Sequence, residues 1–143
     1  MESYVPLLEQ TRQWADRRKR VTFPLIPGYV FARFNARMLA TVLRTPGVVT
    51  IVRQAQSLAP VLPEELESIR ILVACVNSGG APPEPAEFLE AGQEVMVSRG
   101  PFSGIRGVLV EDRGRTRVVI RLLALRKALS VELPREMLRA AAG

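Results

Sequence analysis

The densest group of chemically similar side chains in this sequence is a run of four consecutive basic residues: Arg17, Arg18, Lys19 and Arg20. Arg12 and Trp14 precede this run. Guanidinium and ammonium groups bind phosphate oxygens, and each neutralised phosphate increases both the affinity and its salt dependence. A tryptophan can stack on an unpaired base. The alternative to nucleic-acid binding is that the run forms a solvated loop and that the Trp14 side chain packs over the sheet. We predict that the run binds nucleic acid and that Trp14 is structural.

Strand-like patterns flank this run, at residues 4–8 before it and residues 21–23 after it. We therefore expect the four bases to lie at a hairpin tip or in a loop.

Side chains that perform most enzymatic chemistry are nearly absent. The sequence has no histidine and a single cysteine, Cys75. Ser-His and Cys-His catalysis, histidine-ligated metals, an internal disulfide and a cysteine-clustered zinc site are therefore excluded. Cys75 lies in an apolar stretch and is interpreted as a small core residue. We expect no catalytic activity, no cofactor and no metal.

The overall charge favours polyanionic partners. The 143 residues carry 20 Lys+Arg against 14 Asp+Glu, for a net charge of +6. The 48% of apolar residues is typical of a globular protein. The longest apolar run, residues 71–76, is too short for a membrane helix, and the N-terminus has no signal-peptide pattern. We expect a monomeric, cytoplasmic protein that does not contact membranes.

Composition changes most sharply at residues 77–86, which contain two glycines and three prolines, as is typical of a linker. Residues 78–91 carry three glutamates and no base. Residues 1–77 carry 10 bases and 6 acids, and residues 92–143 carry 10 bases and 5 acids. We predict two basic domains, 1–77 and 92–143, joined by an acidic linker at 78–91.

The first predicted domain mixes helix and strand patterns. Residues 29–34 and 48–52 are rich in aromatic and β-branched side chains, which favours strands. Asn35 is placed to cap a helix. Pro63 is placed to begin a second helix, and Gly79 follows its end. The second helix has an apolar stripe that we expect to be buried: Leu66, Ile69, Leu72, Val73 and Val76. The order strand, helix, strand, helix indicates an α+β fold.

The second predicted domain has only strand patterns, at residues 94–98, 105–111, 118–123 and 129–133. Glycines and a proline mark the turn between the first two strands. We interpret Gly104 and Gly107 as positions where the backbone requires glycine, at a turn or a close approach. Short strands with tight turns predict a small β-barrel.

Two motifs resemble one known family. The segment Phe23-Pro-Leu-Ile-Pro-Gly-Tyr-Val-Phe31, followed by a helix that ends Arg44-Thr-Pro-Gly-Val48, resembles the amino-terminal domain of the NusG family of transcription elongation factors. Residues 92–108 resemble the KOW motif of the same family. The motifs occur in the family's order with a linker between them, and together they cover nearly the whole chain.

The resemblance implies a fold and a function. The amino-terminal domain would be a small antiparallel sheet with flanking helices, which binds the clamp helices of RNA polymerase and suppresses pausing or termination. The KOW domain would be an SH3-like barrel that recruits the ribosomal protein NusE or the termination factor Rho. Upstream or non-template DNA is a further expected partner. The family has no catalytic activity and needs no cofactor.

One part of the family pattern is missing. Family members begin with an aromatic strand and a long helix before the segment that matches residues 2–8. Without them we expect the sheet to have an exposed edge and exposed apolar faces. Either the start lies upstream, or the product is a remnant with impaired polymerase binding.

The resemblance assigns polymerase binding to Leu25, Ile26, Pro27, Gly28 and Tyr29, and Ile26 takes a position where the family often has an aromatic residue. The alternative is a Pro-Gly turn that opens a strand, with Ile26 and Tyr29 in the core.

In the barrel, Phe102, Ile105 and Leu125 match family positions around the edge that binds NusE or Rho. The alternative for Phe102 and Ile105 is ordinary packing. Leu125 lies in an apolar stretch that breaks strict alternation, so we expect an exposed apolar side chain there.

The alternative function is that of a ribosome- or RNA-associated KOW-domain binding protein. Such a protein has no reason to carry the Pro-Gly-Tyr strand and its helix. Within the NusG family, the sequence does not separate a general factor from an operon-specific antiterminator.

Overall fold

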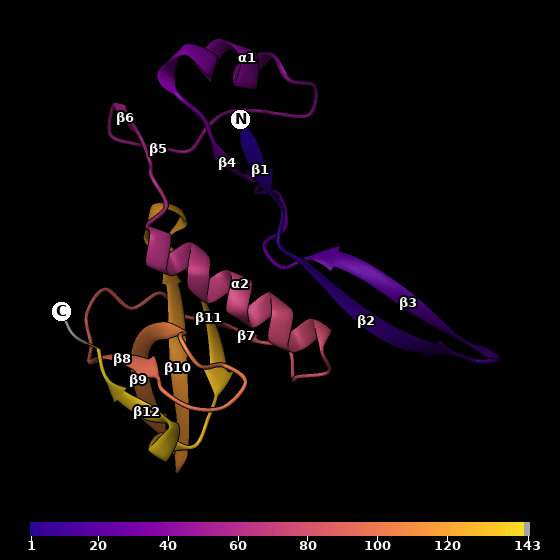
Figure 1. Ribbon diagram of the computed structural model, residues 1–143, viewed down its shortest axis with the longest axis vertical. Coiled ribbons are helices and arrows are strands. Elements are labelled where there is room, and N and C mark those ends of the chain that lie inside the picture. The colour runs from indigo at the N-terminus through magenta and orange to yellow at the C-terminus, as the bar shows by residue number, and fades with distance from the viewer. Residues whose placement is uncertain (142–143) are drawn as a thin grey trace. The chain divides into compact units, whose positions relative to one another are not determined.

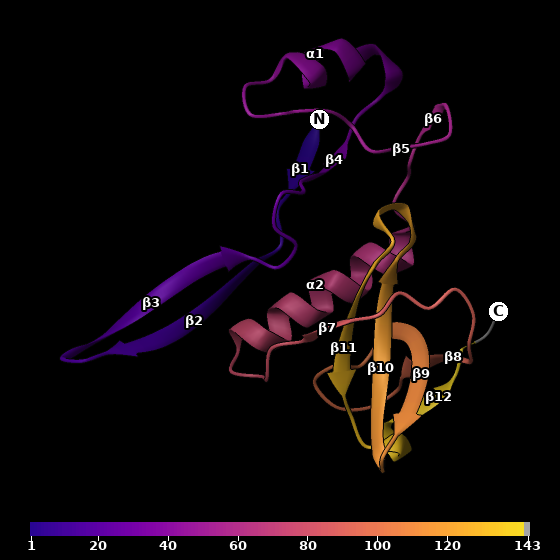
Figure 2. The ribbon, with the colours of Figure 1, turned by 180° about the vertical axis from the view of Figure 1, so that it is seen from behind.

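The computed structural model describes residues 1–141, apart from the side chain of Trp14. The described chain divides into two compact units, Met1–Pro60 and the residues from Val61 onward. Figures 1 and 2 show the elements of both units from opposite sides. Helices are few and every strand pairing in the described chain is antiparallel, so the fold mixes helices and antiparallel sheets, as predicted. None of the described helices is long and apolar enough to cross a membrane.

The first unit contains three separate two-stranded antiparallel sheets, where the resemblance implies one small sheet. Strand β1 pairs with β4, β2 and β3 form a long hairpin, and β5 and β6 form a short one. The bounds are β1 Glu2–Tyr4, β2 Leu7–Trp14, β3 Arg17–Pro24, β4 Phe31–Arg33, a 3-10 turn Ala36–Met38, α1 Leu39–Arg44, β5 Arg53–Gln54 and β6 Ser57–Leu58.

Two local predictions for the first unit are confirmed and one is wrong. The strand expected at residues 29–34 is present as β4, and the Asn35 side chain caps the next helical segment by accepting a 3.0 Å hydrogen bond from the Arg37 amide. The strand predicted at residues 48–52 is not formed, and Val49 is 96% exposed. A β-branched run needs a neighbouring strand to pair its backbone groups, and no described strand pairs with this run.

The second unit consists of helix α2 and a six-stranded antiparallel sheet in the order β12-β8-β9-β10-β11-β7. The four strands that the sequence predicts are present as β8, β9, β10 and β11. The bounds are α2 Pro63–Asn77, β7 Glu84–Ala86, β8 Glu94–Val97, β9 Arg106–Asp112, β10 Arg115–Leu122, β11 Lys127–Glu132 and β12 Leu138–Ala140, with 3-10 turns at Leu123–Leu125 and Arg135–Met137.

The core of the second unit is formed by apolar side chains of the sheet and its turns: Val95, Val97, Ile105, Val108, Val118, Ile120, Leu122, Val131 and Leu133. Gly107 allows β9 to approach β10, because a Cβ there would lie 2.4 Å from the Val119 carbonyl oxygen. Gly104 has a φ of +100°, a conformation that favours glycine. The backbone role predicted for both glycines is confirmed.

Strand β7 falls inside the segment predicted as a linker. Its three residues pair with β11 and form one edge of the sheet. Pro85 is tolerated there because an edge strand leaves some backbone donors unpaired in any case. Further along, the Arg121 guanidinium donates to the carbonyl oxygens of Leu89 and Glu90, at 3.1 Å each. Residues 84–86 of the predicted linker therefore belong to the folded sheet.

Helix α2 begins and ends as the sequence predicts. Pro63 occupies its first position, where a missing backbone N–H costs nothing. At the other end the Gly80 amide donates to the Cys75 carbonyl and the Gly79 amide to the Val76 carbonyl. With Gly79 at a φ of +104°, these two bonds make a Schellman cap.

The buried face of α2 includes most of the predicted stripe. Ile69, Leu72 and Val76 are buried, whereas Leu66 and Val73 are half-buried. The helix packs against β9 and β10. Figures 1 and 2 both show it crossing β10. This packing places α2 in the same compact unit as the sheet, so the units divide at residue 60. The domain limits 1–77, 78–91 and 92–143 stay predictions about the family domains.

Candidate functional site

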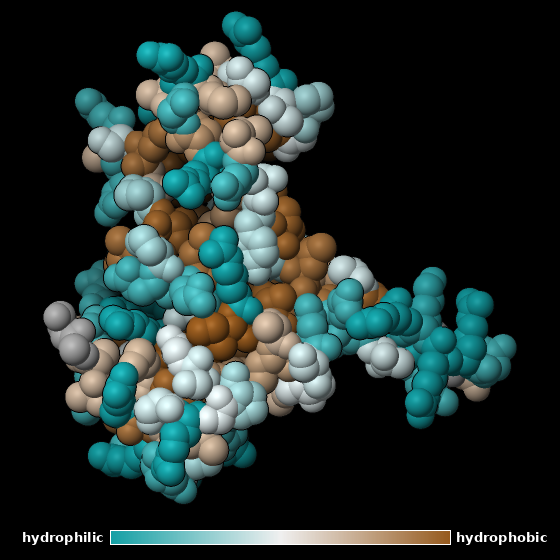
Figure 3. All heavy atoms as spheres, viewed as in Figure 1, coloured by the Kyte–Doolittle hydropathy of each residue, from teal (hydrophilic) through white to brown (hydrophobic). Residues whose placement is uncertain are grey.

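The predicted nucleic-acid-binding run lies in the β2–β3 hairpin. The register pairs Trp14 with Arg17 and Arg12 with Lys19, which leaves only Ala15 and Asp16 in the turn. The hairpin is as expected, but the bases lie in the first half of β3 rather than in a loop. Arg12 and all four residues of the run are exposed. Figure 3 shows hydrophilic side chains over the turn end of this hairpin.

The alternation of side chains along the strands divides these basic residues between the two faces of the hairpin. Residues that pair directly across two strands share a face, and neighbours along a strand do not. By this register Arg12, Arg17 and Lys19 share one face, which we call the Arg12 face. Arg18 and Arg20 lie on the opposite face, the Arg20 face.

The two faces differ in how their charges are compensated. On the Arg20 face, the Arg20 guanidinium forms an ion pair with the Glu9 carboxylate, and Arg18 Nε lies 3.5 Å from Gln13 Oε1. Between them, β2 and β3 carry no acidic residue on the Arg12 face. There the Arg12 guanidinium lies 5.8 Å from the centroid of the Phe23 ring. The role predicted for Trp14 concerns a side chain outside the described part of the chain.

The predicted polymerase-binding residues form a tight turn after the hairpin. The Tyr29 amide donates to the Ile26 carbonyl at 3.3 Å, and Gly28 has a φ of +88°. Proline followed by a glycine of positive φ is typical of a type II turn. The turn explains why this Pro-Gly pair precedes β4.

Burial separates the members of this turn. Ile26 is only 5% exposed, which favours its alternative interpretation as a core residue. Pro27 and Gly28 are exposed, and Leu25 and Tyr29 are half-buried. Val30, directly after the turn, is 62% exposed. Sequence reasoning missed Val30 because its pattern began the strand at residue 29, whereas β4 begins at Phe31.

The predicted partner-binding residues of the barrel also differ in exposure. Ile105 is 0% exposed and offers no contact surface in this structure, whereas Phe102 and Leu125 are half-buried. The most exposed large apolar side chain in this part of the sheet is Leu123, at 45%. It opens the 3-10 turn Leu123–Leu125, which interrupts the alternation of β10. An exposed apolar side chain is present in this stretch, but its position differs from the expected one.

Helix α2 makes two polar contacts with the sheet that its sequence pattern does not reveal. The Ser68 hydroxyl accepts a 3.0 Å hydrogen bond from the Arg106 amide, and the Glu65 carboxylate accepts a 2.9 Å bond from the Leu123 amide. Glu65 is 8% exposed and Ser68 is 1% exposed. A Cβ on Gly104 would lie 2.9 Å from the Cδ1 of Ile71. The helix therefore covers the sheet beside Ile105.

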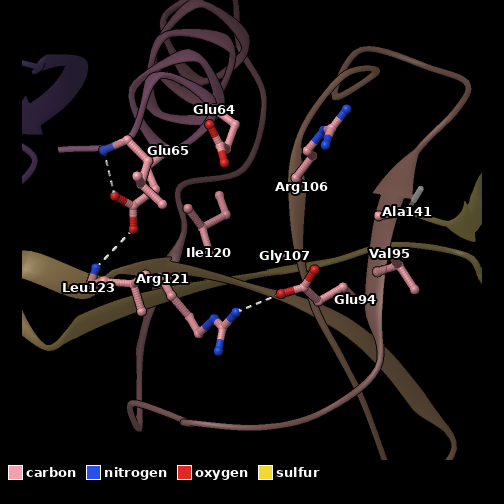
Figure 4. A pocket seen from close by; sticks show the side chains of 11 residues that line it. Glu64, Glu65, Glu94, Val95, Arg106, Gly107, Ile120, Arg121, Leu123 and Ala141 are labelled. Atoms are coloured by element: carbon pink, nitrogen blue, oxygen red, sulfur yellow. Dashed lines mark hydrogen bonds and ion pairs between the residues drawn. The ribbon is translucent and has the colours of Figure 1, made fainter. Parts of the chain in front are cut away.

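A cavity of about 140 Å³ lies where the first turn of α2 meets the sheet (Figure 4). Its lining includes five charged residues: Glu64, Glu65, Glu94, Arg106 and Arg121. Arg121 is held by Glu94 at 3.1 Å, and Glu65 by the Leu123 amide. Typical ligand pockets have volumes of roughly 300–1,000 Å³. The size of this cavity argues against a small-molecule site.

Metal and thiol chemistry find little support. In residues 1–141, no group of three or more His, Cys, Asp or Glu side chains could hold a metal ion. Cys75 is half-buried on α2, and burial raises the pKa of its thiol above the ordinary 9.0. Because the thiolate is the reactive form, a raised pKa makes this cysteine less reactive at neutral pH than a free thiol.

An exposed basic hairpin on one unit and a helix-covered antiparallel sheet on the other define a two-unit protein that mixes helices with antiparallel sheets. The model of a family described as "Transcription termination factor nusG" matches residues 1–70. This stretch includes the hairpin, the type II turn and the first half of α2.

Two curated relatives match over most of the chain. The "Transcription termination/antitermination protein NusG" of Pasteurella multocida (strain Pm70) is 30% identical over 138 residues, which is 92% of this chain and 73% of the relative. The protein of the same name from Buchnera aphidicola subsp. Baizongia pistaciae (strain Bp) is 26% identical over 135 residues, 92% of this chain and 74% of the relative. The chain belongs to the NusG family of transcription termination and antitermination proteins.

Proposed function

We propose that this protein is a transcription elongation factor that binds RNA polymerase in the cytoplasm and suppresses pausing or termination. The observation that carries the proposal is the family match over residues 1–70, which contains both the basic hairpin and the type II turn. The names of two relatives refer to termination and antitermination. Such a factor acts by binding, because stabilising a closed polymerase clamp requires only a higher affinity for the closed state.

The proposal assigns a role to each part of the chain. Residues 1–77 act as the amino-terminal domain, in which Leu25, Pro27, Gly28 and Tyr29 contact the clamp helices and the buried Ile26 supports the turn. Residues 78–91 are the link, and residues 92–143 act as an SH3-like KOW barrel. The order of the six antiparallel strands supports this assignment.

The barrel is proposed to recruit NusE or Rho. Phe102 and Leu125 supply the contact edge, and Ile105 supports it from the core. Leu123 adds exposed apolar area next to Leu125.

A transcription assay with purified RNA polymerase from the same organism tests the central claim. On a template with one strong pause site, we expect the protein to shorten the pause. The variants Tyr29→Ala and Val30→Asp should lose this effect, because they remove apolar contact area at the turn. Gln56→Ala, an exposed position in the β5–β6 turn of the same unit, is the control and should act like the parent protein. An unchanged pause at saturating protein would contradict the proposal.

Co-purification separates the proposal from its alternative. A tagged chain should bring down RNA polymerase. Recovery of ribosomal particles without polymerase would favour a ribosome-associated KOW protein instead.

A further inference from the structure

We infer that the β2–β3 hairpin binds the phosphates of duplex DNA through the Arg12 face alone, that is through Arg12, Arg17 and Lys19. The inference rests on the proposed function, and it refines the prediction that the basic run of this hairpin binds nucleic acid. It changes the set of contact residues, because two members of the predicted run, Arg18 and Arg20, are left out and Arg12 is added.

The first argument is the strand register. A strand turns successive side chains to opposite faces, so four consecutive bases cannot all meet one surface. Arg17 and Lys19 point to the same side, and Arg12 sits directly opposite Lys19 on the neighbouring strand. One face of the hairpin therefore presents three cations, drawn from both strands.

The second argument is charge compensation. The Arg20 guanidinium pairs with Glu9 on its own face, so its charge is partly neutralised within the hairpin. The strands place no carboxylate on the Arg12 face. The Arg12–Phe23 contact orients that guanidinium without neutralising its charge. The Arg12 face thus has the greater net positive charge and is the stronger site for phosphates.

The third argument concerns the form of the nucleic acid. Three cations on one face lie within about 7 Å of a neighbour along or across the strands. Duplex DNA offers one negative charge per about 1.7 Å of its axis, a density that suits such a patch. Single strands are typically bound by stacking bases on aromatic rings. Phe23 lies at the base of the hairpin beneath Arg12, and Trp14, whose side chain is outside the described part of the chain, pairs with Arg17. The duplex assignment therefore rests on charge density, and a direct comparison with a single strand tests it.

The test is the salt dependence of binding to a labelled DNA duplex of mixed sequence, followed by fluorescence anisotropy with the full chain and no polymerase. Two matched double variants each remove two charges from β3: R17Q/K19Q from the Arg12 face and R18Q/R20Q from the Arg20 face. With three contacts, affinity should fall about 40-fold between 50 and 200 mM salt. R17Q/K19Q should retain one contact and fall only about 3–4-fold. R18Q/R20Q should keep the parent's dependence.

A rescue experiment excludes a simple effect of net charge or of misfolding. Adding Gln10→Lys to R17Q/K19Q restores a cation on the Arg12 face. The slope of log affinity against log salt concentration should then steepen by about 0.9, the value for one phosphate contact. Adding Thr11→Lys restores the same charge on the Arg20 face and should not steepen the slope. Equal losses for the two double variants, or equal rescue by the two lysines, would overturn the inference.

The choice of DNA form is tested separately. Tighter binding to a single strand of the same sequence than to the duplex at equal salt would overturn the duplex assignment. The DNA-binding assay contains no polymerase. A negative result in it would overturn the inference about the hairpin, whereas the pausing assay tests the proposed function separately.

Discussion

The Leu123 amide donates a 2.9 Å hydrogen bond to the Glu65 carboxylate, across 58 residues of sequence. The other oxygen of the same carboxylate accepts a 3.0 Å bond from the Leu62 amide, the residue that precedes α2. A single buried side chain therefore satisfies one backbone donor at the start of the helix and one at the end of β10. This link, with Ser68, makes α2 a structural part of the sheet unit.

Replacing Glu65 by Gln should destabilise the second unit. An amide has one acceptor oxygen instead of two, so one buried N–H loses its partner, at a cost of about 1–3 kcal/mol. Urea unfolding of the full chain measures this loss, and amide hydrogen exchange at Leu123 should become faster. Glu64→Gln is the matched control on the exposed side and should change the free energy of unfolding by less than about 0.5 kcal/mol. Equal effects of the two changes would contradict the role of Glu65.

Ile105 and Leu123 should respond oppositely to truncation. Ile105 is fully buried, so Ile105→Ala should cost about 2–5 kcal/mol through lost contacts and a cavity. Leu123 is 45% exposed, and Leu123→Ala should stay within about 0.5 kcal/mol. Thermal unfolding compares the two variants directly. If Ile105→Ala left the midpoint unchanged, Ile105 would be available as a contact residue after all.

Gly107→Ala should be among the most damaging small substitutions. The added Cβ would lie 2.4 Å from the Val119 carbonyl oxygen, and backbone in a paired strand cannot move aside cheaply. We expect the β9–β10 pairing to be disrupted, with a loss of at least about 2 kcal/mol. Ser103→Ala, an exposed position in the preceding turn, is the control. Native-like stability of Gly107→Ala in urea would show that β9 and β10 can separate.

A cut between α2 and β7 should not release the helix. We expect a chain with a specific protease site inserted between Ala81 and Pro82 to give two pieces that co-elute in gel filtration. The reason is the burial of Ile69 and Leu72 against the sheet unit. The same cleavable chain carrying Leu72→Asp should separate, because a charge cannot be buried there without a partner. Separation of the pieces without that substitution would mean that helix and sheet are independent.

The Cys75 thiol should react slowly when the chain is folded. Burial raises its pKa above 9.0, so the thiolate is rarer than in the unfolded chain at the same pH. Alkylation by iodoacetamide at pH 8 should therefore accelerate when urea is added. By linkage, the stability from the protonated thiol is fully present below pH 9 and is lost as the pH rises through the folded pKa. Equal alkylation rates with and without urea would contradict the slow reaction expected of the folded thiol.

The sequence could predict those elements whose signals are local. Helix α2 follows from Pro63 at its start, Gly79 after its end and an apolar stripe between them. The four central strands of the sheet follow from alternation and from turn glycines. In each case neighbouring residues hold the information, because they set the backbone angles and the buried face.

Local signals are insufficient where a distant partner decides the outcome. Residues 48–52 have the side chains of a strand but no strand beside them. Residues 84–86 have the composition of a linker, yet β11 offers them an edge. Glu65 and Ser68 lie four residues before Ile69 and Leu72, on the buried face of the helix, and the amides of Leu123 and Arg106 explain why polar side chains are buried there. No local sequence pattern specifies these long-range contacts.

The two long-range bonds of α2 also determine an order of events during synthesis. Ser68 leaves the ribosome 38 residues before its donor at Arg106, and Glu65 leaves 58 residues before its donor at Leu123. Until β10 has been translated, the helix can form its own turns but lacks one of the two strands on which it packs. The apolar face of the helix is thus incompletely covered during this interval, a state in which aggregation or chaperone binding competes with folding. Helix α2 is therefore synthesised before the sheet of its unit, and its two polar contacts are complete only after β10 has followed.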